Sequence, residues 1–172
     1  MTDSAKRDAA RDELLRLLKG LEFYRAWRLA GIKAANGEIR QEDLNMIVEP
    51  STAFLEYFDN AGGRYSQILQ FVREWYSHTY SDFCLLMNTG GEEVSSEIRK
   101  FLSDFRNEAG FEFQFEAGLV AKTVRKVLKS GKIARENDYY ILKELENSVD
   151  QTILTAVELS AVTDLLRHFE SR

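Results

Sequence analysis

Six basic residues and no acidic residue lie between Glu116 and Glu136. These residues are Lys122, Arg125, Lys126, Lys129, Lys132 and Arg135. Ammonium and guanidinium groups gathered on one face can bind a phosphate, an acidic protein surface or an anionic membrane. Because the whole chain has a net charge of −5, the other residues together carry −11. The six basic residues are therefore the candidate partner-binding site.

The apolar residues around them predict a helix that presents the basic residues to solvent. Between Gly118 and Ser130, leucine, valine and threonine residues recur on one side of a helical projection. The first four basic residues fall on the other side of that projection. The last two, Lys132 and Arg135, follow the predicted helix end at Gly131.

Two structural interpretations compete with a binding role for these residues. Cations are favoured near a helix C-terminus by the helix dipole, which would account for part of their placement. The segment that follows, residues 136–150, holds five acidic residues and one lysine. Two consecutive antiparallel helices could therefore neutralise each other. On charge alone, this neutralisation is the favoured interpretation.

Glu74, His78 and Asp82 are spaced four residues apart, so a helix would line up their side chains along one edge. Histidine and carboxylate groups are ligands of zinc and iron. However, the sequence has only two histidines, and these three positions shift from the solvent side toward the core. We favour a histidine at the core border that hydrogen-bonds a carboxylate, and we predict no metal site.

The single cysteine, Cys84, lies in an apolar run from Phe83 to Met87, and apolar surroundings raise a thiol pKa and keep it inert. The paired glycines lack the sequence context of phosphate-binding loops. No nucleophile–base pair is visible, so the sequence disfavours an enzyme and predicts no cofactor. Catalysis by a pair of Asp or Glu carboxylates from different helices stays an open alternative, because the sequence does not show which helices pack together.

Apolar periodicity and glycine positions predict a mainly α fold. The chain has one proline, Pro50, which suits the first turn of a helix. We expect one compact helical domain over residues 1–172, a bundle of about six to eight helices. The expected helices are one or two over 4–35, and one each over 50–61, 65–88, 92–109, 118–130, 137–147 and 155–169.

Residues 111–115 alternate phenylalanine with polar residues, a period of two that is typical of a strand. The apolar runs 46–48 and 83–87 could pair with it in a small sheet. A lone strand is not stable, so we favour a loop or the start of a helix. A minor β element near 111–115 is the alternative.

The helix over 65–88 is expected to direct Phe71, Val72 and Trp75 toward the core. Tyr76 and Tyr80 flank this apolar stripe. Tyrosine combines an aromatic ring with a hydroxyl group and is common in ligand pockets and binding surfaces. We favour packing at the core edge for both tyrosines.

The composition indicates a folded, soluble protein, because 44% of the residues are hydrophobic and 30% are charged. One cysteine precludes an intramolecular disulfide and makes a reducing, cytoplasmic setting the default expectation. The charged N-terminus does not resemble a secretory signal, and no stretch has the roughly 20 apolar residues that span a bilayer. An acidic chain also argues against general nucleic-acid binding.

These observations together predict a module that binds a protein partner, with no attachment to membranes. A regulatory adaptor and an immunity or antitoxin-type protein are two forms of this hypothesis. The alternative is a small-molecule sensor or enzyme with an aromatic-lined pocket between helices. The partner and the oligomeric state are not encoded in any motif.

Overall fold

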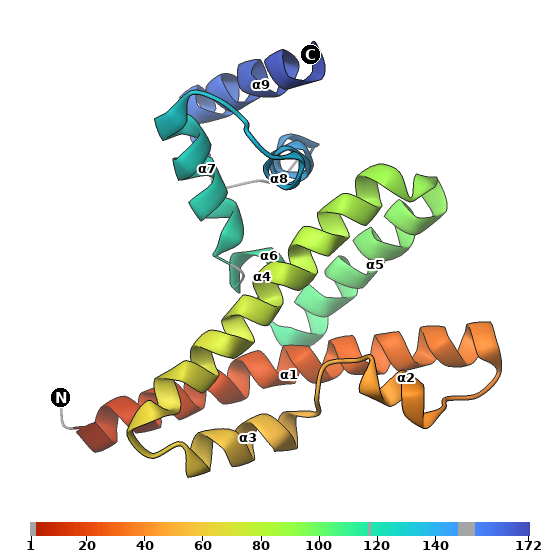
Figure 1. Cartoon of the computed structure of the whole chain (residues 1–172), viewed down its shortest axis with the longest axis vertical. Coiled ribbons are helices and arrows are strands. Elements are labelled where there is room, and N and C mark those ends of the chain that lie inside the picture. The colour runs from red at the N-terminus through yellow and green to blue at the C-terminus, as the bar shows by residue number, and fades with distance from the viewer. Residues whose placement is uncertain (1–2, 117, 148–153) are drawn as a thin grey trace.

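The computed structural model describes residues 3–116, 118–147 and 154–172, and it is built from α-helices and one short 3₁₀ turn (Figure 1). In chain order the elements are α1 (Asp3–Asn36), α2 (Gln41–Asn45), α3 (Ser51–Asn60), η1 (Gly62–Arg64), α4 (Tyr65–Thr89), α5 (Gly91–Ala109), α6 (Phe113–Glu116), α7 (Leu119–Ser130), α8 (Glu136–Asn147) and α9 (Ala156–Glu170). Within these described ranges there is no strand, and seven helices have ten residues or more. The mainly α fold of about six to eight helices is confirmed. The single domain over residues 1–172 stays a prediction.

Local sequence explains several helix boundaries. Pro50 is the N-cap of α3, with a φ of −65° that proline adopts without strain. Thr155 and Glu158 form the capping box that opens α9, in which each side chain binds the other residue's backbone N–H. The N-terminal region, for which one or two helices were expected, is the single helix α1.

Helix α4 is the central element of the molecule. It packs against α1, α3, α5, α6 and α8, and it runs antiparallel to α5 (Figure 1). Helix α1 also packs against α3 and α5. Helices α7, α8 and α9 pack on one another, and most of their contacts with the rest of the molecule are those of α8 with α4 and of α7 with α6.

A cluster of aromatic rings fills the space between α1, α4, α5 and α6. Phe101 lies near its centre, and its ring centroid is 4.4 Å from that of Trp27 and 5.4 Å from that of Phe83. Phe105 and Phe113 are fully buried, and their centroids are 5.0 Å apart. Such pairs add to the stability that burial alone provides. The cluster fixes the positions of α1, α4 and α5 relative to one another.

Residues 111–115 do not form a strand, and the favoured alternative, the start of a helix, is the one observed. Helix α6 begins at Phe113, whose side chain enters the aromatic cluster. Phe111 packs on the same cluster and lies under the Arg16 guanidinium, whose central carbon is 4.5 Å from the ring centroid. The alternating phenylalanines Phe111 and Phe113 therefore each anchor the short segment after α5 to the aromatic cluster.

The inward direction expected for Phe71 is wrong. Its side chain is 58% exposed and packs beside Phe54 of α3 at the surface. Val72 is buried and Trp75 is partly buried against the core, as expected. Tyr76 and Tyr80 lie deeper than the core edge, with 0% and 6% of their surfaces exposed.

Candidate functional site

The residues Lys122, Arg125, Lys126, Lys129, Lys132 and Arg135 form the feature that we call the basic surface. All six are exposed. Helix α7 carries the first four and buries its opposite face through Val120, Thr123, Val124 and Val127. The predicted amphipathic character of this helix is therefore confirmed, and the basic residues are held on a packed scaffold.

The end of α7 is fixed in a way that keeps the last two basic residues next to the helix. Gly131 has a φ of +66°, and its N–H donates a hydrogen bond to the Val127 carbonyl at 2.9 Å. Ile133, between Lys132 and Arg135, is only 2% exposed. The buried isoleucine anchors the loop, so its two flanking cations extend the surface of α7.

Lys126 differs from the other members of the basic surface. Its ammonium group forms an ion pair with Asp138 of α8, at 2.5 Å. Asp138 is 7% exposed, and a buried carboxylate without a partner would be costly. Lys126 therefore has a structural role in joining α7 to α8.

The expected neutralisation of α7 by the following acidic segment is limited to this one pair among the described residues. Glu144 is buried and binds in the opposite direction, to Arg99 of α5 at 2.9 Å and to Asn88 of α4 at 3.1 Å. Glu146 binds Lys143 of its own helix. Asp150 lies outside the described residues. Within the described part, the other five basic side chains form no ion pair.

The structure does not assemble Glu74, His78 and Asp82 into a metal site. Glu74 accepts a hydrogen bond from Gln70, and His78 is exposed. The hydrogen bond expected between His78 and a carboxylate is absent from the described residues, so that prediction is wrong. No group of three or more histidine, cysteine, aspartate or glutamate side chains in the described ranges could hold a metal ion.

Cys84 is fully buried, and burial raises the pKa of its thiol to about 12. The apolar burial and the raised thiol pKa that the sequence predicts are confirmed. A thiol with such a pKa is almost entirely protonated at neutral pH, and the thiolate is the reactive form. Cys84 therefore contributes to packing in the core, in surroundings that disfavour the thiolate.

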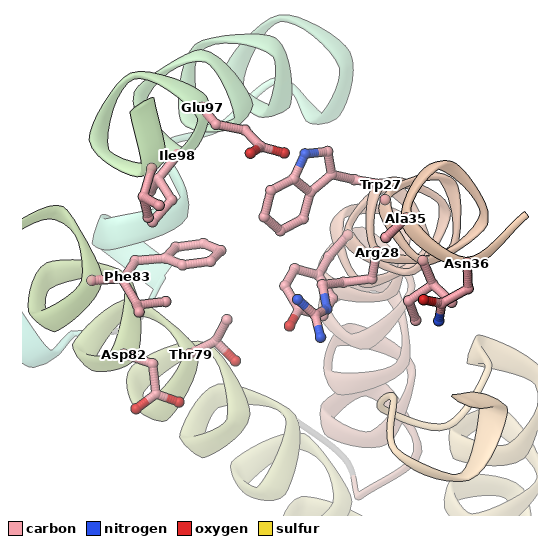
Figure 2. A pocket seen from close by; sticks show the side chains of 14 residues that line it. Trp27, Arg28, Ala35, Asn36, Thr79, Asp82, Phe83, Glu97 and Ile98 are labelled. Atoms are coloured by element: carbon pink, nitrogen blue, oxygen red, sulfur yellow. The ribbon is translucent and has the colours of Figure 1, made fainter. Parts of the chain in front are cut away.

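An open cleft of about 520 Å³ lies between the C-terminal half of α1 and the pair α4 and α5 (Figure 2). Tyr24, Trp27 and Phe83, which belong to the aromatic cluster, line its inner side. Apolar side chains such as Leu86, which is 44% exposed, continue this lining toward solvent. The size is within the range of about 300–1,000 Å³ that is typical of ligand pockets.

Three charged residues from three helices line the same cleft. They are Arg28 of α1, Asp82 of α4 and Glu97 of α5. In Figure 2 the Arg28 side chain extends into the cleft, and Glu97 points toward the indole of Trp27. All three are exposed, and none has an ion pair or hydrogen bond with another described residue. The cleft thus combines an aromatic lining with unpaired charges of both signs.

Tyr24 reports on the electrostatics of this cleft. Burial raises the pKa of its phenol, the nearby Arg28 lowers it, and Asp82 raises it. The phenol therefore senses both charges, which come from different walls. The direction of the shift keeps Tyr24 protonated at neutral pH, so its hydroxyl can donate a hydrogen bond.

Among these charged residues, only Asp82 belongs to a spacing pattern that is visible in the sequence, and that pattern suggested a different role. Arg28 and Glu97 are far apart in the sequence, and no motif connects them. The cleft lies between helices and has aromatic lining, and the ligand-binding role that the sequence offered as an alternative stays a prediction. Its rings are those of Tyr24, Trp27 and Phe83, whereas Tyr76 and Tyr80 are buried in the core.

Comparison of the chain with protein-family models, with curated proteins and with solved structures finds no match. None of the helices in the described ranges has the length and apolar character needed to cross a membrane. The chemistry of the two surface features is therefore the basis for assigning a function.

Proposed function

We propose that this protein is a binding module that docks through its basic surface against an acidic patch on a protein partner. A regulatory adaptor or an immunity or antitoxin-type protein could use such a surface. The observation that carries the proposal is the lack of ion pairs at five of the six basic residues within the described part of the chain. Their charges are available to a partner, apart from that of Lys126.

The charge distribution favours a protein partner over a nucleic acid. The residues outside the 117–135 stretch carry a net charge of −11, which repels an extended polyanion. An acidic protein patch of similar size to α7 would contact the basic residues without approaching the acidic remainder of the chain. Complementary charges of this kind increase the association rate and the specificity more than the affinity.

The test is a pull-down from a lysate of the source organism with three baits of the same fold. The first is the wild-type protein. The second carries Lys122→Glu, Arg125→Glu and Lys129→Glu, and it leaves Lys126 in place because Lys126 pairs with the buried Asp138. The third carries Lys19→Glu, Lys33→Glu and Arg64→Glu, three exposed positions outside the basic surface. Both variants change the net charge by the same amount.

We expect the wild type and the third bait to retain the same partner, and the second bait to lose it. Raising the salt concentration should weaken the retained complex, because screening acts on exposed charges. Circular dichroism spectra of the baits check that all three are folded. Equal retention by the three baits, or no retention by the wild type, would contradict the proposal.

A further inference from the structure

The cleft between α1, α4 and α5 has opposite charges on opposing walls. Arg28 stands on α1, whereas Asp82 and Glu97 stand on α4 and α5 (Figure 2). Arg28 extends into the cleft (Figure 2), and it forms no ion pair with any carboxylate among the described residues. Each wall therefore keeps a charge that a ligand could meet.

A glycine keeps the α1 wall of the cleft open. Gly31 lines the cleft, and a Cβ atom built there would have no atom within 4 Å. No close packing thus requires glycine at this position, although glycine destabilises a helix relative to alanine. The open space beside Gly31 gives a ligand room against the helix backbone.

We propose that this cleft binds a small zwitterion with an apolar body, of the class of hydrophobic α-amino acids. The ligand carboxylate would pair with Arg28, and its ammonium group would lie near Glu97 and the Trp27 ring (Figure 2). The apolar body would rest on Phe83 and Leu86. This site is separate from the basic surface and goes beyond the docking function.

Charge complementarity selects a zwitterion over a ligand with one charge. A purely anionic ligand would meet Arg28 but would be repelled by Asp82 and Glu97. A purely cationic ligand would meet the two carboxylates but would be repelled by Arg28. Only a ligand with both charges pairs with both walls. The aromatic lining adds apolar contact and a cation–π contribution from Trp27.

The test is isothermal titration calorimetry with chemically matched probes. L-leucine and L-phenylalanine represent the proposed ligand class. Phenethylamine keeps only the ammonium group of L-phenylalanine, and 3-phenylpropionate keeps only its carboxylate. We expect at least one amino acid to bind with a dissociation constant in the micromolar to millimolar range, and about tenfold more tightly than the single-charge probes.

Variants identify the site. Arg28→Gln and Glu97→Gln should each weaken amino-acid binding by about tenfold, the size expected for loss of one charged contact. Lys33→Gln on α1 and Glu108→Gln on α5 are matched controls outside the cleft and should leave binding unchanged. Gly31→Leu should fill the open space and abolish binding, while circular dichroism shows an intact helical fold.

The outcomes are decisive in both directions. Absence of binding by both amino acids at millimolar concentration would overturn the proposal. Equal affinity for the single-charge probes, or equal loss in the control variants, would do the same. Because none of these variants touches the basic surface, failure here is distinguishable from failure of the docking function.

Discussion

Gly20 and Gly31 belong to the same helix, α1, and have opposite surroundings. A Cβ atom at Gly20 would lie 2.4 Å from the Tyr76 hydroxyl oxygen and 2.5 Å from the Phe105 ring. At Gly31 a Cβ atom would meet no atom within 4 Å. The nearby charges differ in the same way, because Glu13 binds both Arg16 and Arg73, whereas Arg28 has no partner among the described residues.

This difference separates a part of α1 that packs tightly in the core from a part that is open to a ligand. Around Gly20 the helix backbone approaches α4 and α5 so closely that a side chain has no space. Around Gly31 the same helix diverges from them and lines the cleft. Substitutions in the first part should therefore change stability, and those in the second part should change binding with little loss of stability.

The largest effect is expected for Gly20→Ala. The added methyl group clashes with Tyr76 and Phe105, which are fully buried and have no room to move. Overpacking of this kind costs about 1–3 kcal/mol, so we expect the free energy of unfolding to fall by about 2–3 kcal/mol. Urea denaturation followed by circular dichroism measures this change. An unchanged midpoint would show that the close approach is not a constraint.

Tyr76→Phe should have the next largest effect. The Tyr76 hydroxyl donates a buried hydrogen bond to the Leu17 carbonyl at 2.6 Å, and its loss should cost about 1–1.5 kcal/mol. The double variant with Gly20→Ala sharpens the comparison, because the hydroxyl oxygen that the methyl group meets is then missing. We expect the double variant to lose less stability than the sum of the single variants. Simple additivity would contradict this contact.

Glu13→Gln should cost about 0.5–1 kcal/mol at pH 7, since its ion pairs are partly exposed. The hydrogen bond from Arg16 is the main cause that lowers the pKa of Glu13, and the hydrogen bond from Arg73 lowers it further. Partial burial acts in the opposite direction and raises this pKa. A lowered pKa means that this stability is present above the unfolded-state pKa and is lost as pH falls through the folded-state pKa. The difference between wild type and variant should therefore shrink between pH 7 and pH 3 in urea denaturation. A difference that is constant with pH would exclude the ion pairs as its source.

Gly31→Ala should have the smallest effect and the opposite sign. Alanine fits the open position and favours the helix, so the free energy of unfolding should rise by about 0.5 kcal/mol. Arg28→Gln, which breaks no ion pair in the described structure, should change it by less than about 0.5 kcal/mol. A clear destabilisation by either substitution in urea denaturation would end the distinction between the two parts of α1.

The sequence predicts the helices well because their limits depend on local signals. Pro50, Gly131 and the Thr155–Glu158 box mark ends that short-range backbone geometry and side-chain capping impose. The five-residue helix α2 was not predicted, because an element that short has no detectable periodicity. The exposure of Phe71 was also missed, because periodicity places a residue on a helix face without showing whether a neighbouring helix covers it.

The sites were less predictable for a related reason. The basic surface is contiguous in sequence and could be listed residue by residue. Charge alone favoured its neutralisation by the following acidic residues, but Glu144 turns toward Arg99 and Asn88, a direction that the packing of α8 on α4 determines. The cleft needs three helices to meet, so Arg28 and Glu97 have no signature in the chain.

The two tryptophans of the sequence, Trp27 and Trp75, both belong to the aromatic cluster, where each packs against Tyr24. Helices α7, α8 and α9 contain no tryptophan. Fluorescence excited selectively in tryptophan therefore reports the unfolding of the α1–α4–α5 part of the molecule. It does not report directly on helices α7, α8 and α9, which include the basic surface. Coincident melting curves from fluorescence and from far-ultraviolet circular dichroism would indicate that both parts unfold as one cooperative unit.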